Sequence, residues 1–267
     1  IAHGCNSVVA TDFALKHANY VVTEAGFGAD LGAEKFLDIK SRILKQVPDA
    51  VVLVITCRAV AHTGIKNVLR HYNNLKRFGL NVIVAINKFT SDTLEEYEEL
   101  ERNLNYFNIN YAYVNGWAEG GSGCTDLAEK VVELCKVPVT FKPLYDVCDS
   151  TENKLKALAI YYGTNKIELS PRAQKAAYLY TMYNIPICVA KTQYSFSDDP
   201  ELLGAPEDFT LHITDLKYCA GAEFIVAYTG SIMTMPGLPK KPAAENIDVK
   251  DGKIADSKVI DNGGFGH

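Results

Sequence analysis

A glycine-rich run that also carries carboxylates is the part of this sequence with the clearest chemical potential. It reads TEAGFGADLGAEKF at residues 23–36 and follows residues 20–22, which we predict to form a short strand. Glycine lets the backbone come close to a ligand, and Glu24 and Asp30 could hold a metal ion or orient a cationic group. Open α/β sheets bind their ligands where strands end. The run is therefore a candidate site.

Two aromatic side chains each follow a predicted strand. Phe89 comes after the apolar run at residues 81–86, and Trp117 comes after residues 111–114. If these strands are neighbours, both rings lie at one edge of one sheet. There they could sandwich a flat heterocycle, with each stacking contact worth about 1 kcal/mol. The alternative is that both rings only cap the core, and their positions along the chain do not separate the two hypotheses.

The opening residues and a later loop are candidates for binding an anion. His3 and Asn6 precede a predicted helix, and the amino end of a helix suits an anion. His3 could transfer a proton or bind phosphate; alternatively, it only tethers the loop. Lys191 follows a strand predicted at residues 185–190, where its charge could meet a phosphate or carboxylate. Ser195 could donate a hydrogen bond nearby, although a purely structural loop is the alternative.

The elements that would position these residues alternate between strand and helix. Residues 50–56 and 81–86 are continuous apolar runs, which are typical of parallel strands buried on both faces. Between them, residues 65–78 form an amphipathic pattern that Gly79 ends. Such an alternation predicts an α/β fold with a mostly parallel sheet flanked by helices.

The same patterns divide the chain into three parts. Residues 1–136 form a ligand-binding α/β domain, residues 137–150 form a connector with two prolines, and residues 151–267 form a smaller α/β region with an extended tail. The remaining predicted elements are helices at residues 93–105 (with Asp92 as N-cap), 152–162 and 171–183, and strands at residues 209–213 and 224–228.

Composition excludes several classes of protein. The formal net charge of the 267 residues is −5, which argues against nucleic acid as the main partner. None of the seven cysteines forms a Cys-x-x-Cys pair, and this pattern favours reduced thiols in the cytoplasm over a metal centre. No apolar run approaches the roughly 20 residues of a membrane span, and no signal peptide is evident. We therefore expect a cytoplasmic enzyme with no membrane partner.

Three motifs in this order resemble formate–tetrahydrofolate ligase. They are IAHGCNS at residues 1–7, the glycine-rich run, and TMPGLP at residues 234–239, and the resemblance extends to about residue 254. It implies a sheet of the P-loop NTPase type and a two-stage reaction. Formate first attacks the γ-phosphate of ATP to give formyl phosphate, and the N10 amine of tetrahydrofolate then takes the formyl group. The implied cofactors and partners are ATP with Mg²⁺, formate, tetrahydrofolate, a monovalent cation and identical subunits in a tetramer.

The resemblance also implies roles for individual residues. In this family, the positions of Phe89 and Trp117 clamp the pterin ring, and the loop that contains Phe27 lies beside it. The opening segment with His3 and Asn6 borders the formyl phosphate site. For Glu24 and Asp30 the resemblance leaves two roles, to help position magnesium or to accept a proton from the folate amine. Lys191 and Ser195 would lie in a loop that faces the active site.

Departures from the family pattern leave other functions open. The phosphate-binding motif Gly-x-x-x-x-Gly-Lys-Ser/Thr does not occur in this sequence, and in the family its place would be before Ile1. Residues 255–267 do not resemble the family's usual ending. One alternative is a non-catalytic folate- or nucleotide-binding subunit that needs a partner chain for the phosphate loop. Another is a different P-loop ligase that shares only the fold.

Overall fold

The computed structural model describes residues 5–26, 28–230, 232, 249–250 and 253–254. The chain divides into two units, residues 1–232 and residues 233–267. In the second unit, the described residues form the antiparallel pair β9 (Val249–Lys250) and β10 (Lys253–Ile254). The motif at residues 234–239 and the tail at residues 255–267 lie outside the described residues. All that follows concerns the first unit.

A parallel sheet forms as predicted. Its order is β1 (Val51–Ile55), β2 (Val82–Asn87), β3 (Tyr111–Val114), and both pairings are parallel. The central strand β2 is buried almost throughout. The prediction that the first run is buried on both faces was wrong, because β1 pairs with β2 alone among the described strands and its Val54 is 61% exposed.

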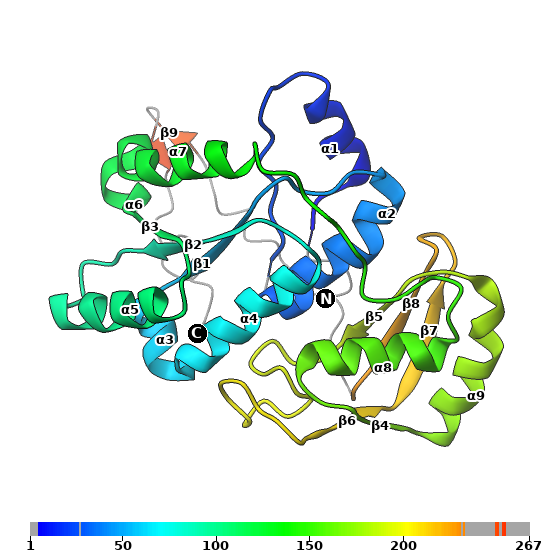
Figure 1. The fold of residues 1–267 in the computed structure, drawn as a ribbon. Helices are drawn as coiled ribbons and strands as arrows, with labels where there is room; N and C mark the ends of the chain where they lie inside the picture. Colours follow the sequence, from blue (N-terminus) through cyan, green and yellow to red (C-terminus); the bar gives the residue numbers. More distant parts are fainter. Residues whose placement is uncertain (1–4, 27, 231, 233–248, 251–252, 255–267) are drawn as a thin grey trace. The chain divides into compact units, whose positions relative to one another are not determined.

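Helices lie between these strands and after the last of them (Figure 1). They are α3 (Cys57–Thr63), α4 (Ile65–Arg77), α5 (Leu94–Tyr106), α6 (Gly116–Glu119) and α7 (Thr125–Leu134). A short 3₁₀ turn, η3 (Gly120–Cys124), precedes α7. The end of α4 is confirmed, with Gly79 in the left-handed region at φ 75°. The predicted cap of α5 was wrong. Thr93 is the N-cap and forms a capping box with Glu96, so Asp92 is left for another contact.

The later part of the unit holds two small sheets. The helices are α8 (Thr151–Tyr162) and α9 (Pro171–Tyr180), followed by the 3₁₀ turn η4 (Thr181–Tyr183). In one sheet β4 (Lys166–Leu169) pairs in parallel with β6 (Thr210–Ile213). In the other, β8 (Phe224–Tyr228) lies between β5 (Ile187–Ala190), which is parallel to it, and β7 (Asp215–Cys219), which is antiparallel. Residues 137–150 contain neither helix nor strand.

The opening segment differs from its prediction. Helix α1 (Val8–Leu15) begins at its N-cap Ser7. Residues 20–22 do not form a strand, because they have no ladder partner; only an isolated bridge joins Cys5 to Ala25. Val22 is 96% exposed. The glycine-rich run therefore does not follow a sheet strand.

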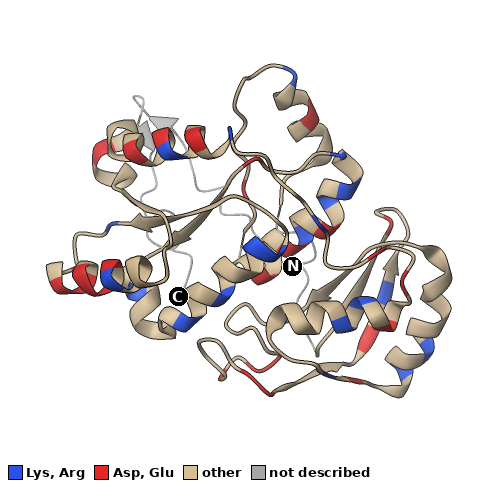
Figure 2. Ribbon diagram, viewed as in Figure 1, with Lys and Arg blue, Asp and Glu red and all other residues tan. Residues whose placement is uncertain are grey.

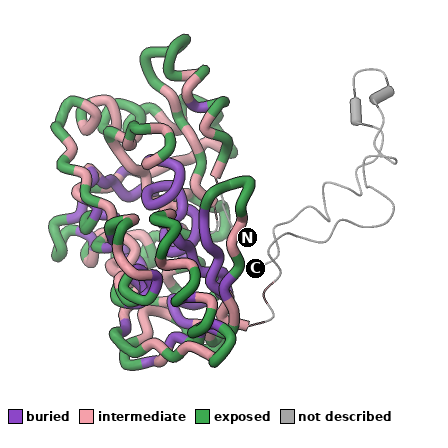
Figure 3. Tube along the Cα trace, turned by 90° about the vertical axis from the view of Figure 1, so that its right-hand side faces the viewer, coloured by how far each residue is buried: buried purple, intermediate pink, exposed green. Residues whose placement is uncertain are grey.

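The helix after the glycine-rich turn is unusually wide. It comprises two π-helical stretches, η1 (Ala29–Ala33) and η2 (Phe36–Lys40), and ends in α2 (Ser41–Leu44). Nearly all of residues 29–41 are buried, although several are charged. In Figure 3 the buried residues run through the interior of this unit. No helix among the described residues is both long and apolar enough to cross a bilayer.

Candidate active site

Two exposed aromatic rings lie at one edge of the parallel sheet. Asn87 at the end of β2 pairs with Val114 at the end of β3, so the segments that carry Phe89 and Trp117 leave the sheet at the same carboxyl edge. Phe89 is 50% exposed and Trp117 is 87% exposed. Neither ring is buried in the core, so the structure does not support the core-capping alternative.

The glycine-rich turn folds back on its own helix. Gly28 has φ 105°, which an L side chain rarely adopts. A Cβ on Gly32 would lie 2.0 Å from the carbonyl oxygen of Gly26, so only glycine fits there. Glu24 is exposed beside this turn, whereas Asp30 is buried. Phe27 and His3 lie outside the described residues.

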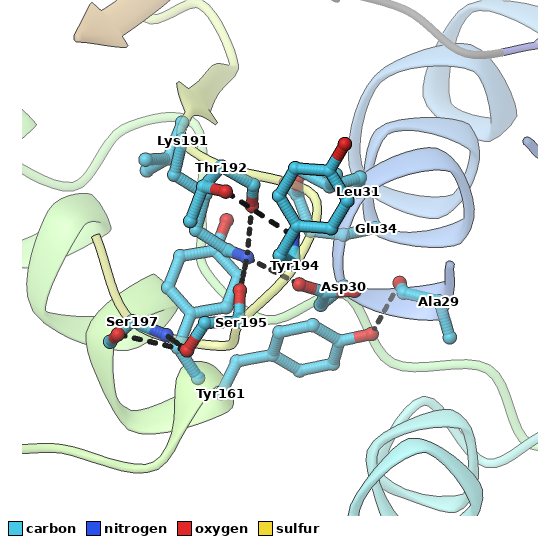
Figure 4. Close-up of polar contacts among 12 residues, drawn as sticks. Ala29, Asp30, Leu31, Glu34, Tyr161, Lys191, Thr192, Tyr194, Ser195 and Ser197 are labelled. Carbon is cyan, nitrogen blue, oxygen red and sulfur yellow. Dashed lines mark hydrogen bonds and ion pairs between the residues drawn. The ribbon is translucent and has the colours of Figure 1, made fainter. Parts of the chain in front are cut away.

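Lys191 is bound by the protein itself (Figure 4). Its buried ammonium donates to the carboxylate of Asp30 and to the carbonyl oxygens of Thr192 and Ser195. Burial lowers the pKa of Lys191, while Asp30 opposes this shift. An ammonium has three donors, and all three are used here. Through its bond to Asp30, Lys191 joins the end of β5 to the start of η1.

The loop after β5 is held by its serines. Ser195 Oγ donates to the carbonyl of Leu202 at 2.6 Å and accepts from the backbone N–H of Ser197 at 3.0 Å. Both serine side chains are buried. Asn6 also has a tethering position, since its Oδ1 accepts from Lys40 Nζ at 2.6 Å and from the hydroxyl of Thr23. These contacts tether both segments to the rest of the unit.

Charged side chains are buried within the wide helix. Lys35 Nζ lies 3.7 Å from Glu34 Oε2 and donates to the carbonyl of Val189 at 3.2 Å. Neither oxygen of Glu34 has a hydrogen-bond partner among the described residues. Burial raises the pKa of Glu34 to about 8, against the opposing effect of Lys35. Burial also raises the pKa of Asp38 to about 7, although it accepts from the N–H of Leu144 and lies near Arg42.

These raised pKa values predict how stability depends on pH. Both folded-state pKa values exceed the ordinary ones of 4.5 and 3.8, so the folded state holds protons that the unfolded state has lost. The free energy of unfolding should therefore fall as the pH rises from about 4 to about 8. The Glu34→Gln variant should flatten this fall in urea titrations, while the exposed control Glu95→Gln should keep it. An unchanged slope in Glu34→Gln would contradict the prediction.

His71 borders the glycine-rich turn and was not predicted. Its Cε1 lies 3.8 Å from where a Cβ on Gly28 would sit, and its ring packs on Phe196 with 4.5 Å between centroids. Its Nδ1 is buried with no partner among the described residues, and burial lowers its pKa. A single histidine within an amphipathic helix gives no signal of such a position in the sequence.

The described part of the chain holds no group of three or more His, Cys, Asp or Glu residues placed to bind a metal ion. Asp30, one of the candidates for magnesium, is paired with Lys191. The carboxylate of Asp30, held in this ion pair, does not fit the predicted role of a magnesium ligand.

A parallel three-stranded sheet with helices between its strands defines an α/β protein. The sequence pattern of the family described as "Formate--tetrahydrofolate ligase" matches residues 1–256. The chain belongs to this family.

Curated relatives agree with this assignment. Formate--tetrahydrofolate ligase of Limosilactobacillus reuteri subsp. reuteri (strain JCM 1112) is 46% identical over 278 residues, which cover 95% of this chain and 50% of that relative. The protein of the same name from Staphylococcus aureus (strain NCTC 8325 / PS 47) is 48% identical over 273 residues, which cover 94% of this chain and 49% of the relative. The chain thus spans about half the length of the curated relatives it matches.

Proposed function

We propose that this chain forms the folate side of a formate–tetrahydrofolate ligase. The observation that carries the proposal is the pair of exposed rings, Phe89 and Trp117, at the ends of two adjacent parallel strands. Two rings in this position can hold a pterin by stacking. Stacking would orient the N10 amine for attack on an activated formyl group and so lower the entropic part of the barrier.

The full reaction needs groups beyond those described. ATP, carrying Mg²⁺, would phosphorylate formate to formyl phosphate, and the amine would then displace phosphate. By resemblance to the family, the phosphate loop would lie in the half of the relatives' length that this chain does not match. A sheet of the P-loop NTPase type, a homotetramer and a cytoplasmic location complete the proposal by resemblance to the family.

Trp117 is the only tryptophan in the chain, so its fluorescence reports on the proposed site. Adding tetrahydrofolate should quench this emission to saturation, because a stacked pterin accepts energy from the indole. Formate should not compete. An emission that does not change, together with no binding heat in calorimetry, would contradict the proposal.

Because the chain matches about half of its relatives' length, a second candidate function is a folate-binding subunit that does not catalyse the reaction. Both candidates predict quenching of Trp117. They differ when a polypeptide with the unmatched half of a relative is added: the ligase releases ADP in a formate-dependent manner, and the binding subunit does not.

A further inference from the structure

The turn that carries Phe89 is closed by contacts with Asp92. The backbone N–H of Phe89 donates to Asp92 Oδ2 at 2.9 Å, and the N–H of Asp92 donates to the carbonyl of Phe89 at 3.1 Å. A carboxylate that accepts a backbone N–H makes a charge-assisted bond, which is stronger than a neutral one. The backbone of Phe89 is therefore held in place, while half of its side chain stays exposed.

The same carboxylate joins the turn to α5. The hydroxyl of Tyr97 donates to Asp92 Oδ2 at 2.7 Å. Burial and the bond to Asp92 both raise the pKa of Tyr97, so this phenol remains a donor throughout the physiological range. Asp92 Oδ2 thus accepts two bonds at once, one from the turn and one from the helix.

Lys88, on the other side of Phe89, is held by aromatic rings. The lysine is exposed, and its Nζ lies 5.4 Å from the ring centroid of Tyr97 and 5.2 Å from that of Tyr113. The two rings meet at 90°. Each such cation–π contact contributes about 0.5–1 kcal/mol at a partly exposed site. Lys88, which precedes Phe89, and Asp92, three residues after it, therefore both contact Tyr97.

We propose that Asp92 and Tyr97 are positioning residues that hold Phe89 ready to stack on the flat ring of the substrate. The inference rests on the proposed function, since it needs Phe89 to contact the pterin. A phenylalanine on a free loop would lose conformational entropy on binding, and a loop that is already fixed avoids much of this cost. Asp92 acts through the backbone of Phe89, and Tyr97 acts through Asp92.

A merely structural role in starting α5 does not account for these contacts. The amino end of α5 is already capped by Thr93 and Glu96, whose side chains bond each other's backbone N–H groups. Both bonds of Asp92 Oδ2 are extra to this capping box. Thr93→Ala therefore serves as a matched control, because it weakens the start of α5 and leaves the bonds of Asp92 in place.

The test is a titration of each variant of this chain with tetrahydrofolate, with the emission of Trp117 as the signal. Asp92→Ala should raise the dissociation constant about five- to tenfold, and Tyr97→Phe, which keeps the ring under Lys88, about threefold. Asp92→Asn, which keeps an acceptor for Phe89, should recover most of the loss. Thr93→Ala should lower the urea midpoint of unfolding without changing the dissociation constant.

Phe89→Ala, measured in parallel, separates the two proposals. If it weakens binding while Asp92→Ala and Tyr97→Phe do not, the positioning role is overturned and the stacking role of Phe89 stands. The positioning role is also overturned if Thr93→Ala weakens binding as much as Asp92→Ala, since stability alone would then explain the loss. If Phe89→Ala leaves binding unchanged, the stacking role in the proposed function fails.

Discussion

The Lys191→Met variant is expected to unfold with a free energy about 3–5 kcal/mol below that of the parent chain. Lys191 is buried, and its ammonium is bound by Asp30 and two carbonyl oxygens. Methionine has a similar length but no donor. The variant would leave the carboxylate of Asp30 buried without a partner, and that uncompensated charge causes most of the loss. Urea unfolding followed by circular dichroism measures it.

Two controls sharpen this measurement. Lys156→Met removes an exposed pair with Glu152 at 2.8 Å and should change the free energy by less than about 1 kcal/mol. The double variant Lys191→Met/Asp30→Leu removes both charges and should recover much of the loss. A loss in Lys191→Met no larger than that in Lys156→Met would show that the buried pair contributes little to stability.

The Trp117→Ala variant is expected to bind tetrahydrofolate roughly 10- to 100-fold more weakly than the parent chain, by analogy with aromatic stacking on bases. Because its ring is 87% exposed, Trp117 contributes little to the core. The free energy of unfolding should therefore stay within about 0.5 kcal/mol of the parent value. Calorimetry is the suitable measurement, since the variant has no tryptophan emission.

Tyr178→Ala is the matched control for the loss of an exposed ring. Tyr178 lies on α9 and is 85% exposed, yet it is not at the carboxyl edge of the sheet. Its removal should leave folate affinity unchanged. Trp117→Phe should keep part of the affinity, because it retains an aromatic face. Equal affinities for Trp117→Ala and the parent would exclude the ring from the binding site.

The strands and helices with strong apolar periodicity were predictable from the sequence. β2, β3, α4 and α8 lie within two residues of their predicted bounds, and the two predicted aromatic positions fall at a common sheet edge. Strands β4 and β7 were missed. Both are only five residues or fewer and mix lysine and acidic residues with apolar ones, so their pairing depends on distant partners.

The interior of the site was less predictable than its edge. Residues 20–22 have strand-forming side chains but find no partner, and pairing cannot be read from local sequence. Glu34 and Asp38 are of a type that is almost always exposed, so their burial could not be expected. Asp92 stands one residue before the true cap, Thr93, and either could cap by its chemistry.

The helix after Gly28 has more residues per turn in its two π-helical stretches than an α-helix has. In η1 the N–H of Glu34 donates to the carbonyl of Ala29, and in η2 the N–H of Ser41 donates to that of Phe36, each five positions back rather than four. Because a π turn holds one residue more than an α turn, each stretch takes up an extra residue while the helix beyond it continues. Deleting one residue from either stretch would therefore narrow that turn to an α turn rather than rotate all the later side chains.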